Sequence, residues 1–275
     1  METRTVLLIS RGTMTGGQMI GQCLERHEGI RCVTRENLLE AVNSYGDIAT
    51  RVTARIEKAA EAYDEFSQLR RPYQILMKRA LLEYARQGCV AYFGYSGHLL
   101  VDRVRHFVLV RLIAPMEMRI ARARERLGYS DEDARAFVHK QDLERTRWAR
   151  WMYGVDIREP AIYDACLNMA RTSLETTCCL LRGLMMQADF QPTQESLAQV
   201  ENDYLATEVL AALIIERRTH HLEISATVTD GVLRLVGPYL SESEISLVRS
   251  IAASVPGVGK IEYQPGYEPA FRYSN

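Results

Sequence analysis

The stretch VLLISRGTMTGGQMIGQCLER, residues 6–26, decides the fold of the first part of the chain. The apolar run 6–9 predicts a buried strand, residues 10–17 a glycine-bearing turn, and residues 19–26 an amphipathic helix. A strand that leads through glycines into a helix forms an anion site, because backbone N–H groups point inward and the helix N-terminus carries about half a positive charge. The stretch therefore predicts a phosphate-binding loop, with a plain strand-to-helix connection as the alternative.

The loop departs from the P-loop consensus GxxxxGK[ST], in which the lysine contacts phosphates and the hydroxyl binds magnesium. Gly12 and Gly17 fit this spacing, but Gln18 and Met19 stand at the lysine and hydroxyl positions. The sequence thus keeps the backbone cradle and lacks the loop lysine. The residues expected to bind the phosphates of a nucleotide are Ser10, Arg11, Gly12, Thr13, Thr15, Gly16, Gly17 and Gln18.

The composition is that of an ordinary globular protein of one large or two medium-sized domains. Apolar residues make up 47% and charged residues 25% of the 275 residues. The formal charge of −1 gives no general attraction to nucleic acid or to an anionic membrane, so we expect no nucleic-acid partner. The first residues lack a signal-peptide pattern, and no apolar run has the length of a membrane span. We therefore expect a cytoplasmic protein.

The cysteines show no metal-ligand spacing. The six are Cys23, Cys32, Cys89, Cys166, Cys178 and Cys179. No two of them form a CxxC pair, and most lie in apolar patterns. We expect reduced, buried thiols and no metal, with a metal site as the alternative.

Five short apolar runs separated by helical patterns predict an α/β fold. They lie at 5–10, 30–33, 89–94, 107–113 and 162–168. Alternating strands and helices imply a parallel sheet covered on both faces, with ligands at the carboxyl ends of the strands. Residues 50–87 predict two helices that meet near 70–72, and a solvated helical insertion is one interpretation of them.

Two arginine-rich helices are predicted between 115 and 153, with residues 128–131 capping the first and starting the second. Nine arginines lie between residues 119 and 158. Most of them are expected to be exposed helix charges, but two or three that converge on the glycine loop would form a phosphate clamp.

The pattern changes after a helix at 172–187. The polar segment 188–196 predicts a linker, and a helix at 200–218 follows it. Alternating residues on both sides of Asp230-Gly231 predict a hairpin, before a helix at 241–254 and a strand at 258–263. We therefore expect one domain at 1–190, a small α-β-β-α-β domain at 200–265, and a tail at 266–275.

The first part of the chain, roughly residues 4–187, resembles the cytidylate kinase-like family of P-loop nucleoside monophosphate kinases. Residues 9–21 resemble the family's ISRxxxxGGxxIG start, and 90–97 its VIVGRG segment. Residues 142–156 follow its lid pattern, DxxRxxW and then YGxD, and 163–168 its YDxxLN strand. The resemblance implies a P-loop kinase-like sheet with a helical lid. It also implies transfer of a phosphoryl group from ATP, with Mg²⁺, to CMP or dCMP.

The resemblance also suggests roles for residues and shows departures. In the register of ordinary cytidylate kinases the lysine falls on Gly17, and the family commonly has arginines where Gln18 and Tyr95 stand here. The charge at the transferring phosphate would then come from the lid. The expected catalytic residues are Arg145, Asp142 and Arg122, and the expected substrate-binding residues are Gly94, Tyr95, Gly97 and Asp156.

Three functional classes stay open at this point. The chain is a nucleoside monophosphate kinase, a nucleotide-binding regulator without catalysis, or an interaction protein whose first part is a scaffold. Asp142 and Arg145 are spaced i,i+3, so an ordinary surface ion pair is an alternative to a catalytic role.

The C-terminal part, about residues 200–265, resembles a BON domain. Residues 231–237 and 255–258 are close to that family's GxVxLxG and VPGV signatures. The resemblance implies a module that binds a membrane or a partner protein and carries no chemistry.

Overall fold

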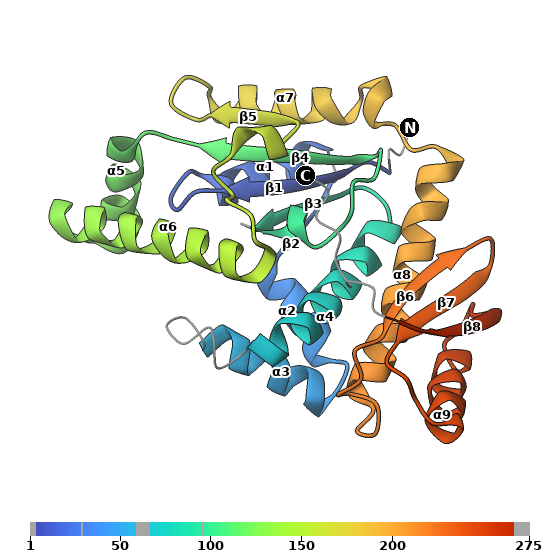
Figure 1. The fold of residues 1–275 in the computed structure, drawn as a ribbon. Helices are drawn as coiled ribbons and strands as arrows, with labels where there is room; N and C mark the ends of the chain where they lie inside the picture. The colour runs from blue at the N-terminus through green and yellow to red at the C-terminus, as the bar shows by residue number, and fades with distance from the viewer. Residues whose placement is uncertain (1–3, 29, 59–66, 95, 267–275) are drawn as a thin grey trace. The chain divides into compact units, whose positions relative to one another are not determined.

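A computed structural model describes residues 4–28, 30–58, 67–94 and 96–266 of the chain (Figure 1). These residues form two compact units, Met1–Arg35 with Gln87–Thr193, and Glu36–Arg86 with Gln194–Asn275. The tail expected at 266–275 lies outside the described residues except for Gly266. Within the described ranges, no helix combines the length and the apolar character that crossing a bilayer requires.

The first unit is built on a five-stranded parallel sheet in the order β2-β3-β1-β4-β5. Its strands are β1 (Val6–Arg11), β2 (Arg31–Thr34), β3 (Val90–Gly94), β4 (Phe107–Ile113) and β5 (Ala165–Asn168). All five predicted strands are confirmed, with shifts of a few residues at their ends. β1 and β4 each begin with four consecutive apolar residues and β3 is apolar up to its final glycine, a pattern that fits strands with both faces covered.

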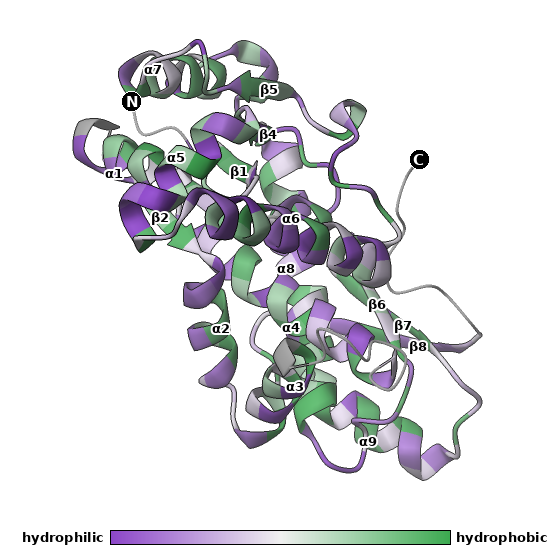
Figure 2. Ribbon diagram, turned by 90° about the vertical axis from the view of Figure 1, so that its left-hand side faces the viewer, coloured by the Kyte–Doolittle hydropathy of each residue, from purple (hydrophilic) through white to green (hydrophobic). Residues whose placement is uncertain are grey.

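The helices of this unit connect the strands. They are α1 (Gly17–Glu28), α5 (Met116–Leu127), α6 (Asp131–Tyr153) and α7 (Leu174–Met185), with short 3₁₀ turns η2 (Gly97–Leu99), η3 (Pro160–Ile162) and η4 (Ala188–Phe190). α5 ends at Gly128 in a left-handed conformation, and the Ser130 hydroxyl then accepts the Asp133 N–H to start α6. Much of α6 is hydrophilic (Figure 2). We call α5 and α6 together the arginine hairpin.

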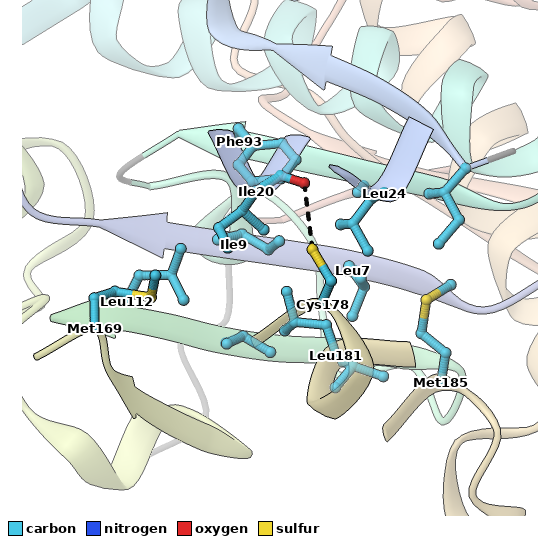
Figure 3. Close-up of a cluster of buried hydrophobic side chains, with 14 residues drawn as sticks. Leu7, Ile9, Ile20, Leu24, Phe93, Leu112, Met169, Cys178, Leu181 and Met185 are labelled. Atoms are coloured by element: carbon cyan, nitrogen blue, oxygen red, sulfur yellow. Dashed lines mark hydrogen bonds between the residues drawn. The ribbon is translucent and has the colours of Figure 1, made fainter. Parts of the chain in front are cut away.

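One face of the sheet forms the main core of the unit with α1 and α7. Leu7 and Ile9 alternate along β1 toward this face, where Ile20 of α1 and Leu181 of α7 pack (Figure 3). All four side chains are buried. Burying each such side chain contributes roughly 1.5 to 3 kcal/mol to the free energy of unfolding. This packing fixes the start of α1 with respect to the end of β1.

The cysteines differ from expectation. Cys23 of α1 and Cys178 of α7 are joined by a disulfide, with 6.6 Å between their Cα atoms, so the prediction of reduced thiols is wrong for this pair. Of the others, Cys32 and Cys89 are half-buried, whereas Cys166 and Cys179 are exposed. Spacing along the chain could not show this, because only the packing of α1 on α7 brings the two sulfurs together.

The second unit combines helices from two separate parts of the chain. It contains α2 (Arg35–Asn43) apart from its first residue, α3 (Asp47–Lys58), α4 (Ser67–Arg86) and α8 (Gln194–Ile215), and α4 packs on both α3 and α8. The predicted helix break near 70–72 is wrong, since α4 continues through Pro72. The proline forfeits one backbone hydrogen bond, but burial of Tyr73, Ile75 and Leu76 beside it outweighs that loss. The interpretation of 50–87 as a solvated insertion is wrong for the same reason.

The rest of the second unit is the predicted α-β-β-α-β sequence of elements. After α8 come β6 (Ser225–Thr229), β7 (Val232–Gly237), α9 (Glu242–Ala253) and β8 (Lys260–Pro265). β6 and β7 are antiparallel around a turn in which Asp230 and Gly231 have φ of 51° and 75°, as a two-residue hairpin requires. β8 adds to β7 in parallel.

The helix α8 belongs with α4 as well as with this small sheet. It begins at Gln194, so the linker is shorter than the expected 188–196. Along the α4–α8 contact, Arg86 is paired with Glu201 at 2.8 Å, and Arg79 with Glu208. A boundary at 190–200 stays a prediction, but it would separate two helices that share a packed face.

Candidate functional site

The loop that follows β1 lies at the carboxyl end of the central strand of the sheet. From β1 the chain passes through α1 to β2 on one side, whereas β4 lies on the other side of β1. The strand order thus reverses at β1, which is where open α/β sheets bind ligands. In the sheet register, Ser10 is opposite both Gly94 and Arg111. The segments that follow β3 and β4 therefore begin beside this loop.

Two residues with positive φ shape the loop. Met14 has φ of 58° and Gly16 of 99°, and Gly17 is the first residue of α1. A Cβ on Gly16 would lie 3.1 Å from Nη1 of Arg122. Gly16 therefore takes the place of the glycine that precedes the lysine in the consensus, and Gly17 that of the lysine itself. The loop geometry favours this register over the one that puts the lysine at Gln18.

Thr13 in the loop is held from both sides by the arginine hairpin. Oδ1 of Asp142 accepts its N–H at 3.0 Å, and Nε of Arg119 donates to its carbonyl oxygen at 2.6 Å. Arg119 and Asp142 also form an ion pair with each other. Burial alone would raise the pKa of Asp142, but the hydrogen bonds from Arg119 and Thr13 and the Arg119 charge hold it below its usual value. Asp142 is therefore ionised at neutral pH and positions the loop.

Met14 anchors the loop in the arginine hairpin by packing. Its side chain contacts the small core formed by Ile120, Ala123, Ala134 and Val138 of α5 and α6. Nη1 of Arg122 donates to its carbonyl oxygen at 3.3 Å. Since the C=O of one residue and the N–H of the next point in opposite directions across a trans peptide, the arginine contacts to the carbonyl oxygens of Thr13 and Met14 turn the N–H groups of Met14 and Thr15 away from the hairpin.

Four arginines of the hairpin reach the loop. Besides Arg119 and Arg122, Arg126 donates to the Gln18 side-chain oxygen, and Arg145 to the carbonyl oxygen of Arg11 at 3.4 Å. The loop atoms that Arg122 and Arg126 contact are neutral oxygens, so these contacts do not cancel the two positive charges. Together with the N-terminus of α1 they form a positive site that fits phosphate.

A buried polar cluster around Arg111 of β4 contacts the start of the loop. The sequence did not predict this cluster. Nη1 of Arg111 lies 3.1 Å from Oγ of Ser10 and 3.3 Å from Oη of Tyr163. The ring of His98 is 4.9 Å from that of Tyr163. Burial, then the charges of Arg111 and Arg103, lower the pKa of His98 to about 3, so this histidine is neutral. Strand register alone places Arg111 beside Ser10, and no local motif marks it.

The expected substrate-binding residues fall into three groups. A Cβ on Gly94 or on Gly97 would collide with the ring of Tyr92, so close packing already explains both glycines. Tyr95 lies outside the described residues. Asp156 is bound by Arg158 and Arg150, each at 2.7 Å, and these hydrogen bonds hold its pKa far below its usual range. Its carboxylate therefore holds a surface turn together.

Among the expected catalytic residues, Arg145, Asp142 and Arg122 all contact the loop backbone. The alternative of an Asp142–Arg145 surface pair is wrong, because Asp142 pairs with Arg119 of the other helix. From the sequence, Arg119 was only one of nine arginines in this region. Its partner Asp142 is 23 residues away, so no local spacing marks the pair.

The site fits a nucleotide phosphate better than it fits a metal ion. The buried Oγ1 of Thr13 has no hydrogen-bond partner in the described part of the chain, and guanidinium and backbone N–H groups surround the loop. By contrast, neither Gln18 nor the exposed Met19, the two residues after Gly17, carries the hydroxyl that usually binds magnesium. Within the described ranges, no group of three or more His, Cys, Asp or Glu residues could hold a metal.

Two curated relatives are cytidylate kinases of archaea. The chain is 23% identical over 129 residues to "Cytidylate kinase" of Pyrococcus horikoshii, a match that covers 47% of this chain and 66% of that protein. It is 30% identical over 101 residues to "Cytidylate kinase" of Methanopyrus kandleri, with 35% and 51% covered. The matches thus span just under two thirds and about half of these relatives' own lengths.

A solved structure shares the fold described above, and a family profile matches the part of the chain that carries the loop. A crystal structure of a Eubacterium ventriosum protein titled only as uncharacterized superposes with a TM-score of 0.53 at 14% identity, covering 66% of this chain and 98% of that one, and shows the fold alone. The profile described as "Cytidylate kinase-like family" matches residues 6–171. With its parallel sheet, its glycine loop and more than half of its length matched, the chain belongs to the cytidylate kinase-like family.

Proposed function

We propose that this protein transfers a phosphoryl group from ATP to a nucleoside monophosphate of the CMP or dCMP class. The observation that carries the proposal is the convergence of hairpin arginines on a glycine loop whose Thr13 is fixed by Asp142 and Arg119. Phosphoryl transfer depends almost wholly on positioning and on stabilising negative charge, and these residues supply both. The names of the two relatives, both cytidylate kinases, suggest the acceptor class.

In this proposal the loop binds the phosphates and the arginine hairpin stabilises the charge of the transferring group. Backbone N–H groups of residue 14 and residues 16–18 bind the phosphates, while Asp142 keeps the loop in shape by accepting the Thr13 N–H. Arg122 and Arg145 stabilise the charge that develops on the transferring group. ATP supplies the phosphoryl group, and magnesium on its oxygens would offset their charge. We assign no residue of this chain to the metal.

The missing loop lysine sets the expected rate. Removing a cation at the transferring phosphate costs on the order of 3 to 5 kcal/mol, or roughly 10² to 10⁴ in rate. Arginines of the hairpin offset part of this cost, since a guanidinium stays charged at all physiological pH values. We therefore expect slow turnover. A cytoplasmic location follows from the proposed substrates, ATP and nucleoside monophosphates.

A second candidate is a nucleotide-binding regulator without catalysis. It is favoured by Gly17 at the lysine position and by Gln18 and Met19 after it, which leave the start of α1 without the lysine and hydroxyl of active loops. In this alternative, nucleotide occupancy is passed to the C-terminal module.

One experiment separates these functions. The unfolding temperature of the full chain is measured against ATP, CMP and CTP, since a ligand that binds only the native state at 100 times its Kd stabilises it by about 2.7 kcal/mol. ADP formation with each monophosphate is followed in parallel. Stabilisation with turnover supports the kinase, and stabilisation without turnover supports the regulator. No stabilisation by any nucleotide contradicts both.

A separate proposal concerns the C-terminal module with the small sheet β6-β7-β8. By its resemblance to a BON domain, residues 200–265 bind an anionic membrane or a protein partner. Tyr239, which follows β7, is 90% exposed and offers an aromatic contact. Sedimentation of the full chain with phosphatidylglycerol vesicles tests the membrane partner, with Tyr239→Ser expected to weaken binding. Equal sedimentation of parent and variant would remove Tyr239 from the proposal, and no sedimentation would remove the membrane.

A further inference from the structure

The side chain of Arg11 occupies the space where the lysine of an ordinary P-loop would start. Gly17 opens α1 directly after the positive-φ residue Gly16, which is the position of the lysine in the consensus. A Cβ built on Gly17 would collide with Cδ of Arg11 and lie 3.1 Å from its Nε. The guanidinium of Arg11 thus begins at the point from which a residue-17 side chain would project.

This placement puts a cation beside the N-terminus of a helix. The N-terminus of α1 already carries a partial positive charge, so the helix end and the guanidinium both favour an anion at this point. The hairpin adds further positive charge to the same loop through Arg122 and Arg126. Such a concentration of like charge is stabilised when a phosphate binds among the groups, because each guanidinium can then donate charge-assisted hydrogen bonds.

The backbone of Arg11 is fixed by the sheet. Arg11 is the last residue of β1 and is in register with Leu112 of β4, so the sheet sets the position of its Cα. Its carbonyl oxygen accepts from Arg145 at 3.4 Å. Among the hairpin arginines, Arg119 is neutralised by Asp142 and Arg126 is exposed. Preorganised charge is what phosphoryl transfer requires.

We propose that Arg11 is the phosphate-contacting cation of this site and replaces the loop lysine, whose role has moved from the first residue of α1 to the last residue of β1. The inference rests on the proposed binding of ATP. In the transfer, the bond from the terminal phosphorus to the ADP oxygen breaks as a bond to the acceptor's phosphate oxygen forms. Arg11 donates hydrogen bonds to the phosphate oxygens throughout and gives up no proton.

A reciprocal swap of the two positions tests the proposal. Arg11→Met keeps an aliphatic chain over Gly17 and removes the charge, and Arg11→Ala clears the space. Arg11→Ala combined with Gly17→Lys returns a cation from the position of the ordinary lysine. Gly17→Lys alone places two side chains in one space. Arg124→Met, on the exposed face of α5, is the matched control for loss of an arginine.

The readout is the stabilisation of each full-length variant against heat by adenosine, AMP and ATP. We expect Arg11→Met to lose affinity for ATP by about tenfold or more and for adenosine by less than about twofold, since charge-assisted bonds to phosphate are lost. The double variant should recover ATP affinity to within about threefold of the parent, whereas Gly17→Lys alone should not bind better than the parent. Arg124→Met should bind as the parent does.

The outcomes distinguish this inference from the proposed function. A parent that no adenine nucleotide stabilises contradicts the proposed function itself. A parent that binds ATP while a folded Arg11→Met binds equally well overturns the role of Arg11 alone. If Arg11→Met does not fold, Arg11→Lys decides, because it keeps the charge. Unchanged ATP affinity in that variant supports the inference, and a loss as large as that of the uncharged Arg11→Ala overturns it.

Discussion

Asp142 and Arg119 hold opposite sides of the same peptide segment, since the carboxylate accepts the Thr13 N–H while the guanidinium donates to the Thr13 carbonyl oxygen. The two side chains come from different helices and neutralise each other. This pairing fixes the loop without using the charges of Arg122 and Arg126, which leaves those charges for a ligand.

Asp142→Asn should lower both stability and nucleotide affinity. The amide keeps the shape but leaves the buried Arg119 without its counter-charge, which costs about 1 to 3 kcal/mol of the free energy of unfolding. Urea unfolding measures the loss, and ATP titration should show binding at least about tenfold weaker. Asp131→Asn, in the exposed pair with Arg124, is the control and should change stability by less than about 1 kcal/mol. Equal effects of the two substitutions would contradict the role of Asp142 in the loop.

Gly16→Ala should abolish nucleotide binding, and Gly16→Val should do so as well. Both variants strain a residue with φ of 99° and push against Arg122. Gly128→Ala is the matched control, because Gly128 also has positive φ but a Cβ there meets no atom within 4 Å. Both alanine variants should lose stability, by about 1 kcal/mol for the backbone strain, yet only Gly16→Ala should lose ATP binding. A folded Gly16→Val that binds ATP normally would show that the loop is not the site.

Arg145→Ala should reduce turnover by about 10² or more while leaving the fold intact. Deleting a charge contact to the transition state has this cost, and kcat should fall more than KM changes. Arg147→Ala, an exposed arginine on the same helix, is the control and should turn over as the parent does. A parent-like rate in Arg145→Ala would show that other arginines, and not Arg145, stabilise the charge of the transition state.

Gln18→Lys and Gln18→Arg test whether missing charge limits the rate. Gln18 now accepts a hydrogen bond from Arg126, so a cation at residue 18 displaces that arginine as it adds its own charge. We expect faster turnover if charge is limiting. Turnover absent from both the parent and these variants, despite nucleotide binding, would favour the regulator.

The free energy of unfolding should fall as the pH drops from about 6.5 toward 4. Burial lowers the pKa of His98 to about 3 and that of His106 to about 4, whereas both titrate near 6.5 in the unfolded chain. In this window the unfolded state binds more protons, so each histidine contributes a slope approaching about 1.4 kcal/mol per pH unit. His98→Phe keeps a ring beside Tyr163 and should reduce the slope between pH 6.5 and 4 by about half. An unchanged slope would mean that His98 is accessible to protons in the native state.

Sequence patterns determined the elements of the fold to a large extent. Short runs rich in apolar residues predicted all five strands of the parallel sheet, and Gly128 with Ser130 marked where α5 ends and α6 begins. Asp230-Gly231 marked the hairpin. These signals are local, because backbone conformation and burial of a short segment depend mainly on its own residues. The exception is α4, where burial outweighed the proline signal at Pro72.

The sequence by itself thus determined a glycine loop after the first strand of an α/β sheet, and the absence of a lysine in it. Only the tertiary structure decided which charges reach that loop. It paired Asp142 with Arg119 instead of Arg145, laid Arg11 over Gly17, and brought Arg111 beside Ser10. Such contacts join residues up to 134 positions apart, as between Arg11 and Arg145. Spacing along the chain cannot encode them, since they arise only when the packed strands and helices fix the separation of side chains in space.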